Sequence, residues 1–357
     1  MIGEAELSVA VASGPTEPHP RRSGCASAVA NRLAPRRIGA VYVLLLIVVV
    51  FGALEPHTFL TAQTGKTILN QYAVTGLLAL SLVVPLAAGV FDLSVGAQAG
   101  VASVLVATLV VHHRFPIPAA VVLVIVAGQV VGLVNAFVVV VLKVDSFIGT
   151  LGTGAILGAI AIGISGNQTI TGARISGAFE RNIALRNLWG VTIPVGYLLV
   201  VMASIGYVLE RTASGRSWYA IGFDIDAARL AGLRVRLLRG ASLMVSAFIA
   251  SIAGITLTAR VASGTPGAGG AYLLPAFAGA FLGATQFRNG RFNTWGTVLA
   301  VVLIGTGDYG LNLSHAPQWS PQVFDGVALI TAVGLTSLER GRLRRPQWHP
   351  RRLRKRN

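Results

Sequence analysis

Residues 210–239 read ERTASGRSWYAIGFDIDAARLAGLRVRLLR and lie between two long apolar runs. This segment, called the island below, holds six of the chain's 29 Lys and Arg residues. So many charges are not tolerated in the hydrocarbon of a bilayer, and Arg-rich connections between spans collect in the cytoplasm. The island therefore predicts a chain that crosses a membrane on both sides of one charged cytoplasmic segment.

The composition of the chain is that of a multi-spanning membrane protein. Of 357 residues, 54% are hydrophobic and 12% are charged, and the mean hydropathy is +0.69. The formal net charge of +16 is concentrated in tails and loops beside apolar runs, a distribution that membrane topology explains better than nucleic-acid binding. The single cysteine, Cys25, excludes an intrachain disulfide and a thiolate metal cluster, so no metal site is predicted.

Apolar blocks of the length needed to cross a bilayer, about 20 residues as a helix, recur along the chain. They cover approximately residues 38–54, 67–89, 93–111, 117–142, 147–165, 190–209, 241–262, 271–287, 295–311 and 321–338. We therefore predict an all-α polytopic membrane protein with about ten transmembrane helices. The third and eighth blocks are expected to be discontinuous, because Asp92-Leu93-Ser94 and Pro275 indicate helices that begin or break within the membrane.

Positive charge is distributed unequally between the two sides of this arrangement. With ten spans, 23 Lys and Arg residues fall on the side of both termini and the island, and six fall on the other side. By the positive-inside rule, both termini and the island are cytoplasmic. Residues 1–37 are predicted to be a disordered basic tail, 38–338 the membrane domain with a cytoplasmic loop at 210–240, and 339–357 a second basic tail against anionic lipid.

No motif for energy conversion is found in the chain. Gly65-Lys66-Thr67 resembles the end of a phosphate-binding loop, but Leu60 stands where that loop requires its first glycine. The six His residues fall in tails or at the edges of spans, and no span carries the paired acids and His residues of a proton relay or an intramembrane hydrolase. We therefore predict no catalytic residue and no bound cofactor.

Polar side chains inside the apolar blocks indicate either a substrate pathway or hydrogen bonds between helices. An amide both donates and accepts hydrogen bonds, which suits an uncharged polyol better than an ion. The sequence leaves both roles open for each candidate. These pathway candidates are Asn70, Gln71, Gln129, Asn135, Thr150, Thr153 and Asp308.

Two helix starts are predicted from capping residues. Asp92 is interpreted as the N-cap of the third span, with Ser94 and Gly96 in the turn that follows. Within the island, Asp224 is predicted to cap a short helix that Gly232 ends. Asp226 complements the positive end of that helix, and Arg229 lies further along it.

The short helix of the island would carry a small apolar surface. Its members are Ala227, Ala228, Leu230 and Ala231. This surface could fit into a groove of a partner protein and transmit its movement to the flanking spans as a rigid-body tilt. The alternative is an interfacial helix that rests on lipid.

Three motifs resemble one family of membrane proteins. Residues 89–96 read GVFDLSVG and closely resemble the GGIDLSVG signature of ribose, xylose and arabinose type permeases of bacterial ABC importers. Residues 146–153, SFIGTLGT, are similar to the family's SFIVTLGT segment. In the island, GRSWYAIG at 215–222 and AARLAGL at 227–233 look like the family's FGRxxYAIGGNxxAARLSGI loop. The resemblance runs from about Thr58 to Leu335 and departs from the signature at Val90, where the family has a second glycine.

The resemblance implies a permease of about ten helices in the bacterial inner membrane. It implies three partners, namely a cytosolic ATPase that uses the ATP, an extracytoplasmic sugar-binding protein, and a second permease copy or paralogue. It also implies that the island couples to the ATPase through Arg216, Tyr219, Gly222, Asp224, Ala227, Ala228, Arg229 and Gly232. The other functions considered are a permease for branched-chain amino acids or nucleosides, a secondary transporter, and a membrane scaffold that moves no substrate.

Overall fold

The structure is a computed structural model, and it describes residues 35–185, 187–188, 190–287 and 290–343. Most of the two predicted basic tails, 1–34 and 344–357, lies outside the described residues. The regular secondary structure of the described residues is helical apart from a hairpin of β1 (Asn187–Leu188) and β2 (Val191–Thr192) and an isolated bridge between Ile170 and Gly264.

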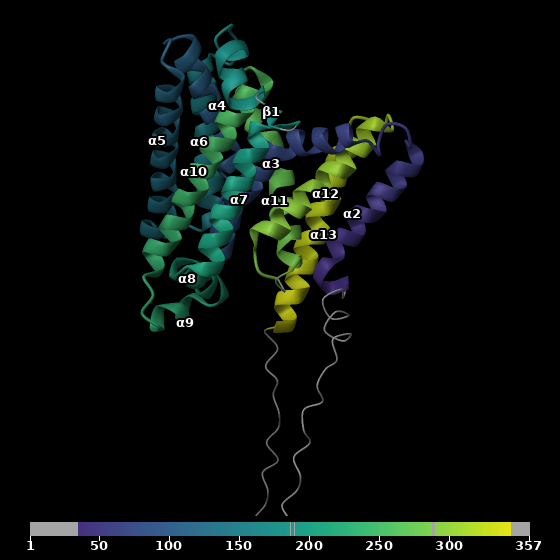
Figure 1. Cartoon of the computed structure of the whole chain (residues 1–357). Helices are drawn as coiled ribbons and strands as arrows, with labels where there is room; N and C mark the ends of the chain where they lie inside the picture. Colours follow the sequence, from purple (N-terminus) through teal and green to yellow (C-terminus); the bar gives the residue numbers. More distant parts are fainter. Residues whose placement is uncertain (1–34, 186, 189, 288–289, 344–357) are drawn as a thin grey trace, which may run out of the picture. The chain divides into compact units, whose positions relative to one another are not determined.

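Each predicted apolar block contains a helix (Figure 1). The helices are α2 (Pro35–Leu54), α3 (Ala62–Ala87), α4 (Val95–Val111), α5 (Ile117–Ala136) with its π-helical extension η1 (Phe137–Val141), α6 (Ser146–Ser165), α7 (Ile193–Arg211), α10 (Val235–Val261), α11 (Leu273–Thr285), α12 (Thr294–Leu313) and α13 (Ser320–Leu343). Among the described residues, 7 helical segments are long and apolar enough to cross a bilayer, and Gly39–Leu54 and Val95–Val111 are shorter apolar helices. The prediction of an all-α polytopic membrane protein is confirmed.

Both predicted discontinuities are present. Residues 88–94 leave the helical conformation between α3 and α4, and we call this segment the break. In the eighth block, the 3₁₀-helix η4 (Ala268–Tyr272) precedes α11, which has only 13 residues. Pro275 lies in the first turn of α11, where its missing N–H costs no helical hydrogen bond.

Short polar residues set several of the helix ends. Thr61 caps α3 by accepting a hydrogen bond from the N–H of Thr64 at 3.1 Å. Asn293 caps α12 in the same way, through the N–H of Gly296 at 2.7 Å. These side chains satisfy backbone donors that the first turn of a helix leaves unpaired.

Helices α3 and α10 lie at the centre of the fold. Helix α3 packs against α7, α10, α11 and α12, and α10 also packs against α4 and α5. Leucines along α3, such as Leu77 and Leu80, are fully buried. By contrast, α2, α5 and α6 expose large apolar side chains, including Leu46 at 61% and Ile148 at 67%. Such surfaces are stable against lipid tails, which are as apolar as the side chains themselves.

Glycines allow two close approaches of backbone to α4. A Cβ atom at Gly254 of α10 would overlap the carbonyl group of Ala99, and one at Gly269 of η4 would overlap the carbonyl group of Gly96. Small residues are enriched where membrane helices approach this closely. Gly96, predicted as part of a helix cap, is therefore placed here as a packing residue.

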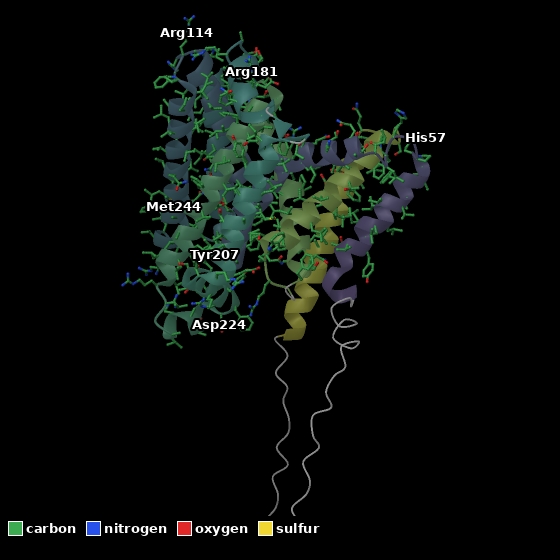
Figure 2. All side chains as sticks on the ribbon, in the orientation of Figure 1. His57, Arg114, Arg181, Tyr207, Asp224 and Met244 are labelled. Carbon is green, nitrogen blue, oxygen red and sulfur yellow. The ribbon has the colours of Figure 1, made fainter. Side chains whose placement is uncertain are left out.

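Two connections predicted to lie on the same side of the membrane are joined to each other and lie far from the island. Arg174 donates to the carbonyl oxygens of Val110 and Phe115 at 3.2 and 3.3 Å, which joins two connections predicted to lie outside the cell. Figure 2 shows Arg114 and Arg181 at the opposite end of the described structure from Asp224 of the island. This placement agrees with an odd number of spans between each of these connections and the island (Figure 2).

Candidate functional site

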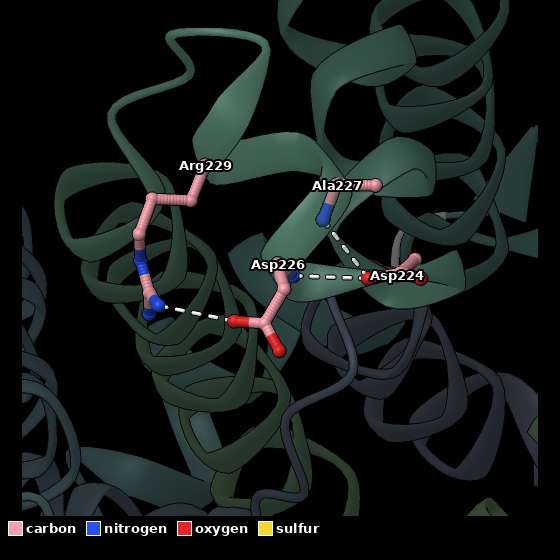
Figure 3. A network of polar contacts seen from close by, with 4 residues as sticks. All are labelled: Asp224, Asp226, Ala227 and Arg229. Carbon is pink, nitrogen blue, oxygen red and sulfur yellow. Dashed lines mark hydrogen bonds and ion pairs between the residues drawn. The ribbon is translucent and has the colours of Figure 1, made fainter.

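The island folds into two short helices, α8 (Ala213–Phe223) and α9 (Ile225–Leu230). Thr212 caps α8 by accepting from the N–H of Gly215 at 3.3 Å. Asp224 then ends α8 and caps α9, because its Oδ1 accepts from the N–H groups of Asp226 and Ala227, each at 3.0 Å (Figure 3). The predicted cap at Asp224 is therefore present, and the sequence reasoning missed α8 as a separate helix.

The C-terminal end of α9 also agrees with the prediction from the sequence. Arg229 forms an ion pair with Asp226 at 3.0 Å (Figure 3). Gly232 has a φ of +81°, the left-handed conformation that commonly follows a helix C-terminus and that glycine adopts without strain. Both ion-pair partners are largely exposed, so the pair contributes less than about 1 kcal/mol to stability.

Helix α8 is fixed to the membrane domain by two aromatic side chains. Trp218 is buried, and its Nε1 donates to the carbonyl oxygen of Leu238 in α10 at 2.8 Å. The hydroxyl group of Tyr219 donates to the carbonyl oxygen of Phe292, and the guanidinium group of Arg291 lies 5.7 Å from the centre of its ring. Both bonds cross to other elements, so they tie α8 to α10 and to the segment before α12.

Helix α8 also touches the break directly. A Cβ atom at Gly222 would overlap the carbonyl group of Ala87, and a Cβ at Gly89 would lie 3.3 Å from the Cα of Gly222. Gly89 has a φ of +69°, which turns the chain out of α3 and favours glycine. Two glycines therefore form the contact between the island and the point where the membrane helix stops.

A second connection between the island and the break runs through aromatic rings. The ring of Phe292 meets that of Phe281 edge to face, with centroids 5.4 Å apart. Phe281 in turn stacks with Phe91 of the break at 6.4 Å. Because Tyr219 bonds to the backbone of Phe292, this path begins on α8 and ends beside Asp92.

The exposed surface of α9 is smaller than the sequence indicates. Ala228 is only 4% exposed and packs with Ile221 and Val235, so it fixes α9 to its neighbours and is not part of a contact surface. Ala227 and Ala231 are exposed, and Leu230 is 90% exposed. Phe223, at the end of α8, is also exposed, at 69%. Arg216 and Gly232 of the coupling prediction are also exposed.

Helix α6 holds the break in place through side-chain hydroxyl groups. Ser146 Oγ accepts from the N–H of Phe91 at 3.1 Å, and Thr150 Oγ1 accepts from the N–H of Leu93 at 2.9 Å. Backbone donors outside a helix need such partners within a membrane. Thr150 is fully buried and donates its own proton to Ser146 O. Thr150 therefore makes a hydrogen bond between segments in this structure, and its role as a pathway residue stays a prediction.

The predicted cap at Asp92 is displaced by two residues. Helix α4 begins at Val95, and Ser94, not Asp92, occupies the N-cap position without a side-chain cap bond. Asp92 Oδ1 instead accepts from the N–H and the hydroxyl group of Ser94, at 3.1 and 2.6 Å. An Asp side chain readily accepts a hydrogen bond from the backbone two residues further on. This local turn at Asp92 moves the start of the helix to Val95. Asn135 of α5 donates to Ser94 Oγ at 2.8 Å and is itself fully buried.

The other pathway candidates lie apart from the break. Asn70 Oδ1 accepts from the N–H and hydroxyl group of Thr192, at 3.0 and 2.8 Å. The backbone oxygen of Gln71 accepts from Arg260. Asp308 of α12 accepts from the hydroxyl group of Tyr72 at 3.0 Å. These bonds join the first half of α3 to Thr192 before α7, to α10 and to α12, and we call the residues that form them the outer polar cluster.

Gln129 and Thr153 belong neither to the contacts around the break nor to the outer polar cluster. Gln129 is partly buried, donates to the carbonyl oxygen of Met244 at 3.4 Å and lines an apolar groove of about 590 Å³. Thr153 donates to Gly149 O within its own helix at 2.9 Å. The structure thus does not assemble the seven predicted side chains into a single polar passage.

Sequence reasoning missed several residues that the structure places in these contacts. Ser146 and Trp218 bind backbone groups of other elements, and the former stands inside the SFIGTLGT motif. Gln98 of α4 is buried and donates to Ala247 O of α10 at 2.8 Å. In the sequence, Gln98 could have been recognised as an amide inside an apolar block. No local signal marked the partners of Trp218.

Residues 66–333 match the protein family described as "Branched-chain amino acid transport system / permease component". The chain belongs to this permease family. It is a multi-pass membrane protein, as the apolar helices require.

Three relatives cover most of the permease. It is 30% identical to the D-allose transport system permease protein of Escherichia coli (strain K12), over 85% of this chain and 92% of the relative. It is 30% identical to the ribose import permease protein of Bacillus subtilis (strain 168), over 84% and 92%. It is 32% identical to the fructose import permease protein of Rhizobium meliloti, over 82% and 83%.

Proposed function

We propose that this permease is the membrane subunit of an ATP-driven importer for a monosaccharide or a similar small polyol. The names of the allose, ribose and fructose relatives support this class of substrate. ATP is bound and hydrolysed by a separate ATPase, and an extracytoplasmic binding protein delivers the substrate. The island and both termini lie in the cytoplasm, as the excess of Lys and Arg on that side favours.

One observation carries the coupling part of the proposal. The island exposes Leu230 and Phe223, while Gly222 on the same pair of helices contacts Ala87 at the end of α3 and Gly89 of the break. An ATPase that binds these exposed side chains would therefore move α8 and α9 together, and α8 contacts the membrane helices where they are discontinuous. Rigid-body displacement of packed helices is a common way to transmit such movement.

The outer polar cluster is the proposed point where the substrate enters. Gln71 and Arg260 offer hydrogen-bonding groups that are at least partly exposed, and Asp308 with Tyr72 lies beside them. Such groups suit hydroxyl-rich ligands. A weak site is sufficient here, because the binding protein supplies affinity and a tight site would slow release. The passage is completed by a second permease copy or a paralogue.

Reconstitution tests this function. The permease is placed in liposomes with the ATPase and the binding protein from neighbouring genes, and uptake of radiolabelled ribose, xylose, fructose and allose is measured with and without ATP. We expect uptake of one of these sugars that requires both ATP and the binding protein. Uptake that continues without the ATPase and collapses with an ion gradient would instead identify a secondary transporter.

The family's description favours one further candidate substrate class, branched-chain amino acids. The same liposomes are therefore tested with labelled leucine and valine. Uptake of leucine without sugar uptake would replace the sugar in the proposal and leave the coupling scheme unchanged. Absence of any flux, with intact assembly of the three proteins, would support a scaffold.

The exposed leucine of α9 gives a prediction for partner binding. Replacing Leu230, which is 90% exposed, with serine is expected to weaken association with the ATPase by about tenfold, as burial of one leucine side chain contributes roughly 1.5 kcal/mol or more. Leu60, 62% exposed in the connection that contains His57 at the other end (Figure 2), is the matched control. Co-purification at graded detergent and salt measures the effect. Equal association of L230S and L60S would remove α9 from the docking surface.

A further inference from the structure

A basic hollow lies beside the island, where the end of α5 and the start of α6 meet the connection between α9 and α10. Its volume is about 940 Å³. The basic side chains that line it are Lys143, Arg229, Arg234, Arg236 and Arg239, and Asp145 is the acidic one among the described lining residues. This surplus of positive charge favours an anionic occupant.

The surplus is not neutralised within the described part of the chain. Asp145 Oδ1 already accepts from the N–H groups of Phe147 and Ile148, at 3.0 and 3.4 Å, as the cap of α6. Arg229 is paired with Asp226. The Nε atom of Arg239 is buried and has no hydrogen-bond partner among the described residues. A buried donor without a partner is costly, and an anion in the hollow would supply one.

An apolar groove of about 620 Å³ continues from the hollow along α5 and α10. The two share Val140, Arg236 and Leu237 as lining residues. The groove is otherwise lined by side chains such as Leu133 and Phe137, which are 61% and 51% exposed. Both helices lie within candidate membrane spans, so the groove faces lipid chains and the hollow lies at one membrane surface.

We propose that the hollow and the groove together bind one anionic phospholipid. The phosphodiester group lies against Arg234, Arg236 and Arg239, and an acyl chain occupies the groove. Guanidinium groups match phosphate oxygens in geometry and charge, and basic pockets between membrane helices on the cytoplasmic side bind anionic head groups. An acidic surface of a partner protein would match the charge of the hollow, but it would leave the adjoining lipid-facing groove unexplained.

The site also touches the island. Ile225 and Arg229 of α9 form part of the wall of the hollow, together with Leu233 in the turn that follows. A bound lipid therefore contacts α9 at Ile225 and Arg229, while Leu230 is not among the lining residues of the hollow. This position would let the lipid composition of the membrane affect how firmly α9 is held.

Lipid binding by the full-length purified chain tests the proposal. The chain in detergent is titrated with phosphatidylglycerol, phosphatidylcholine or glycerol 1-phosphate, and bound lipid is counted by native mass spectrometry. We expect phosphatidylglycerol to bind about tenfold more tightly than phosphatidylcholine. Glycerol 1-phosphate has the head-group charge without acyl chains. If it binds as tightly as phosphatidylglycerol, the hollow is an anion site and the lipid proposal is wrong.

Two variants locate the bound lipid. In R234Q/R236Q, two exposed side chains of the hollow lose their charge, and the preference for phosphatidylglycerol is expected to fall at least about fivefold. The control R114Q/R181Q loses the same charge from exposed side chains at the opposite end (Figure 2) and should keep the preference.

In G240L, a leucine side chain enters the groove, where a Cβ at Gly240 meets Ala136 at 3.5 Å, an ordinary contact distance. This variant should lower binding of the lipid without a change in charge.

Two results with these variants would overturn the lipid proposal. If R234Q/R236Q keeps the lipid preference but no longer binds the ATPase, the hollow belongs to the partner's docking surface and the proposal is overturned. Equal loss in R114Q/R181Q would show a general effect of charge and overturn it as well. Thermal unfolding of each variant shows whether the chain is folded, and neither outcome depends on transport activity.

Discussion

Replacing Gly222 with leucine is expected to lower ATP-driven uptake by at least about tenfold while the protein still inserts into the membrane. Even a Cβ atom at this position would overlap the carbonyl group of Ala87, so a larger side chain must push α8 away from the break. Overpacking of this kind costs about 1–3 kcal/mol, or more where only backbone can yield. Uptake into liposomes and the amount of protein in the membrane fraction measure the two effects separately.

A matched glycine shows whether the effect is local. A Cβ atom at Gly196 of α7 would have no other atom within 4 Å, so leucine fits there without displacement. Uptake by G196L should stay close to that of the unaltered permease. If G222L transports as well as G196L, the contact between α8 and the break has no role in coupling.

Replacing Thr150 with valine is expected to destabilise the permease and to reduce transport. Valine has the same shape but cannot accept from the N–H of Leu93, which lies 2.9 Å from Thr150 Oγ1. An unpaired buried donor costs about 1–3 kcal/mol, and the break is then held by Ser146 alone among these two α6 side chains. Thermal unfolding in detergent and uptake into liposomes measure the change.

Thr153 provides the control in the same helix. Its hydroxyl group donates only to Gly149 O, one turn earlier, where the carbonyl group is already part of the helix. Such bonds within a helix contribute little, so T153V should change the free energy of unfolding by no more than about 0.5 kcal/mol. Equal destabilisation by T150V and T153V would contradict the role assigned to Thr150.

The order of the spans could be predicted because the membrane imposes strong constraints on sequence. Apolar length and the alternation of positive charge act on whole segments, so errors at single residues cancel. The discontinuities were also visible, since Asp92 and Pro275 are costly in the middle of a lipid-facing helix. Asp224 could be recognised as a cap because capping needs only residues adjacent in the sequence.

The contacts between segments could not be predicted in the same way. Thr150 and Asn135 are polar residues inside spans, and their pattern is the same whether they line a passage or bind another helix. Their partners, the N–H of Leu93 and the hydroxyl group of Ser94, lie 57 and 41 residues away in the sequence. The burial of Ala228 depends on Ile221 and Val235, which come together only when the island folds, so the sequence pattern around Ala228 does not reveal it.

Deletion of residues 224–232 tests the central claim most directly, because it removes α9 and leaves α8 and the contact at Gly222 in the chain. The measurement is ATP-dependent sugar uptake by liposomes that contain the permease, its ATPase and the binding protein. We predict that the shortened permease reaches the membrane in normal amounts and that its uptake is lost. Normal uptake after the deletion would contradict coupling through the island.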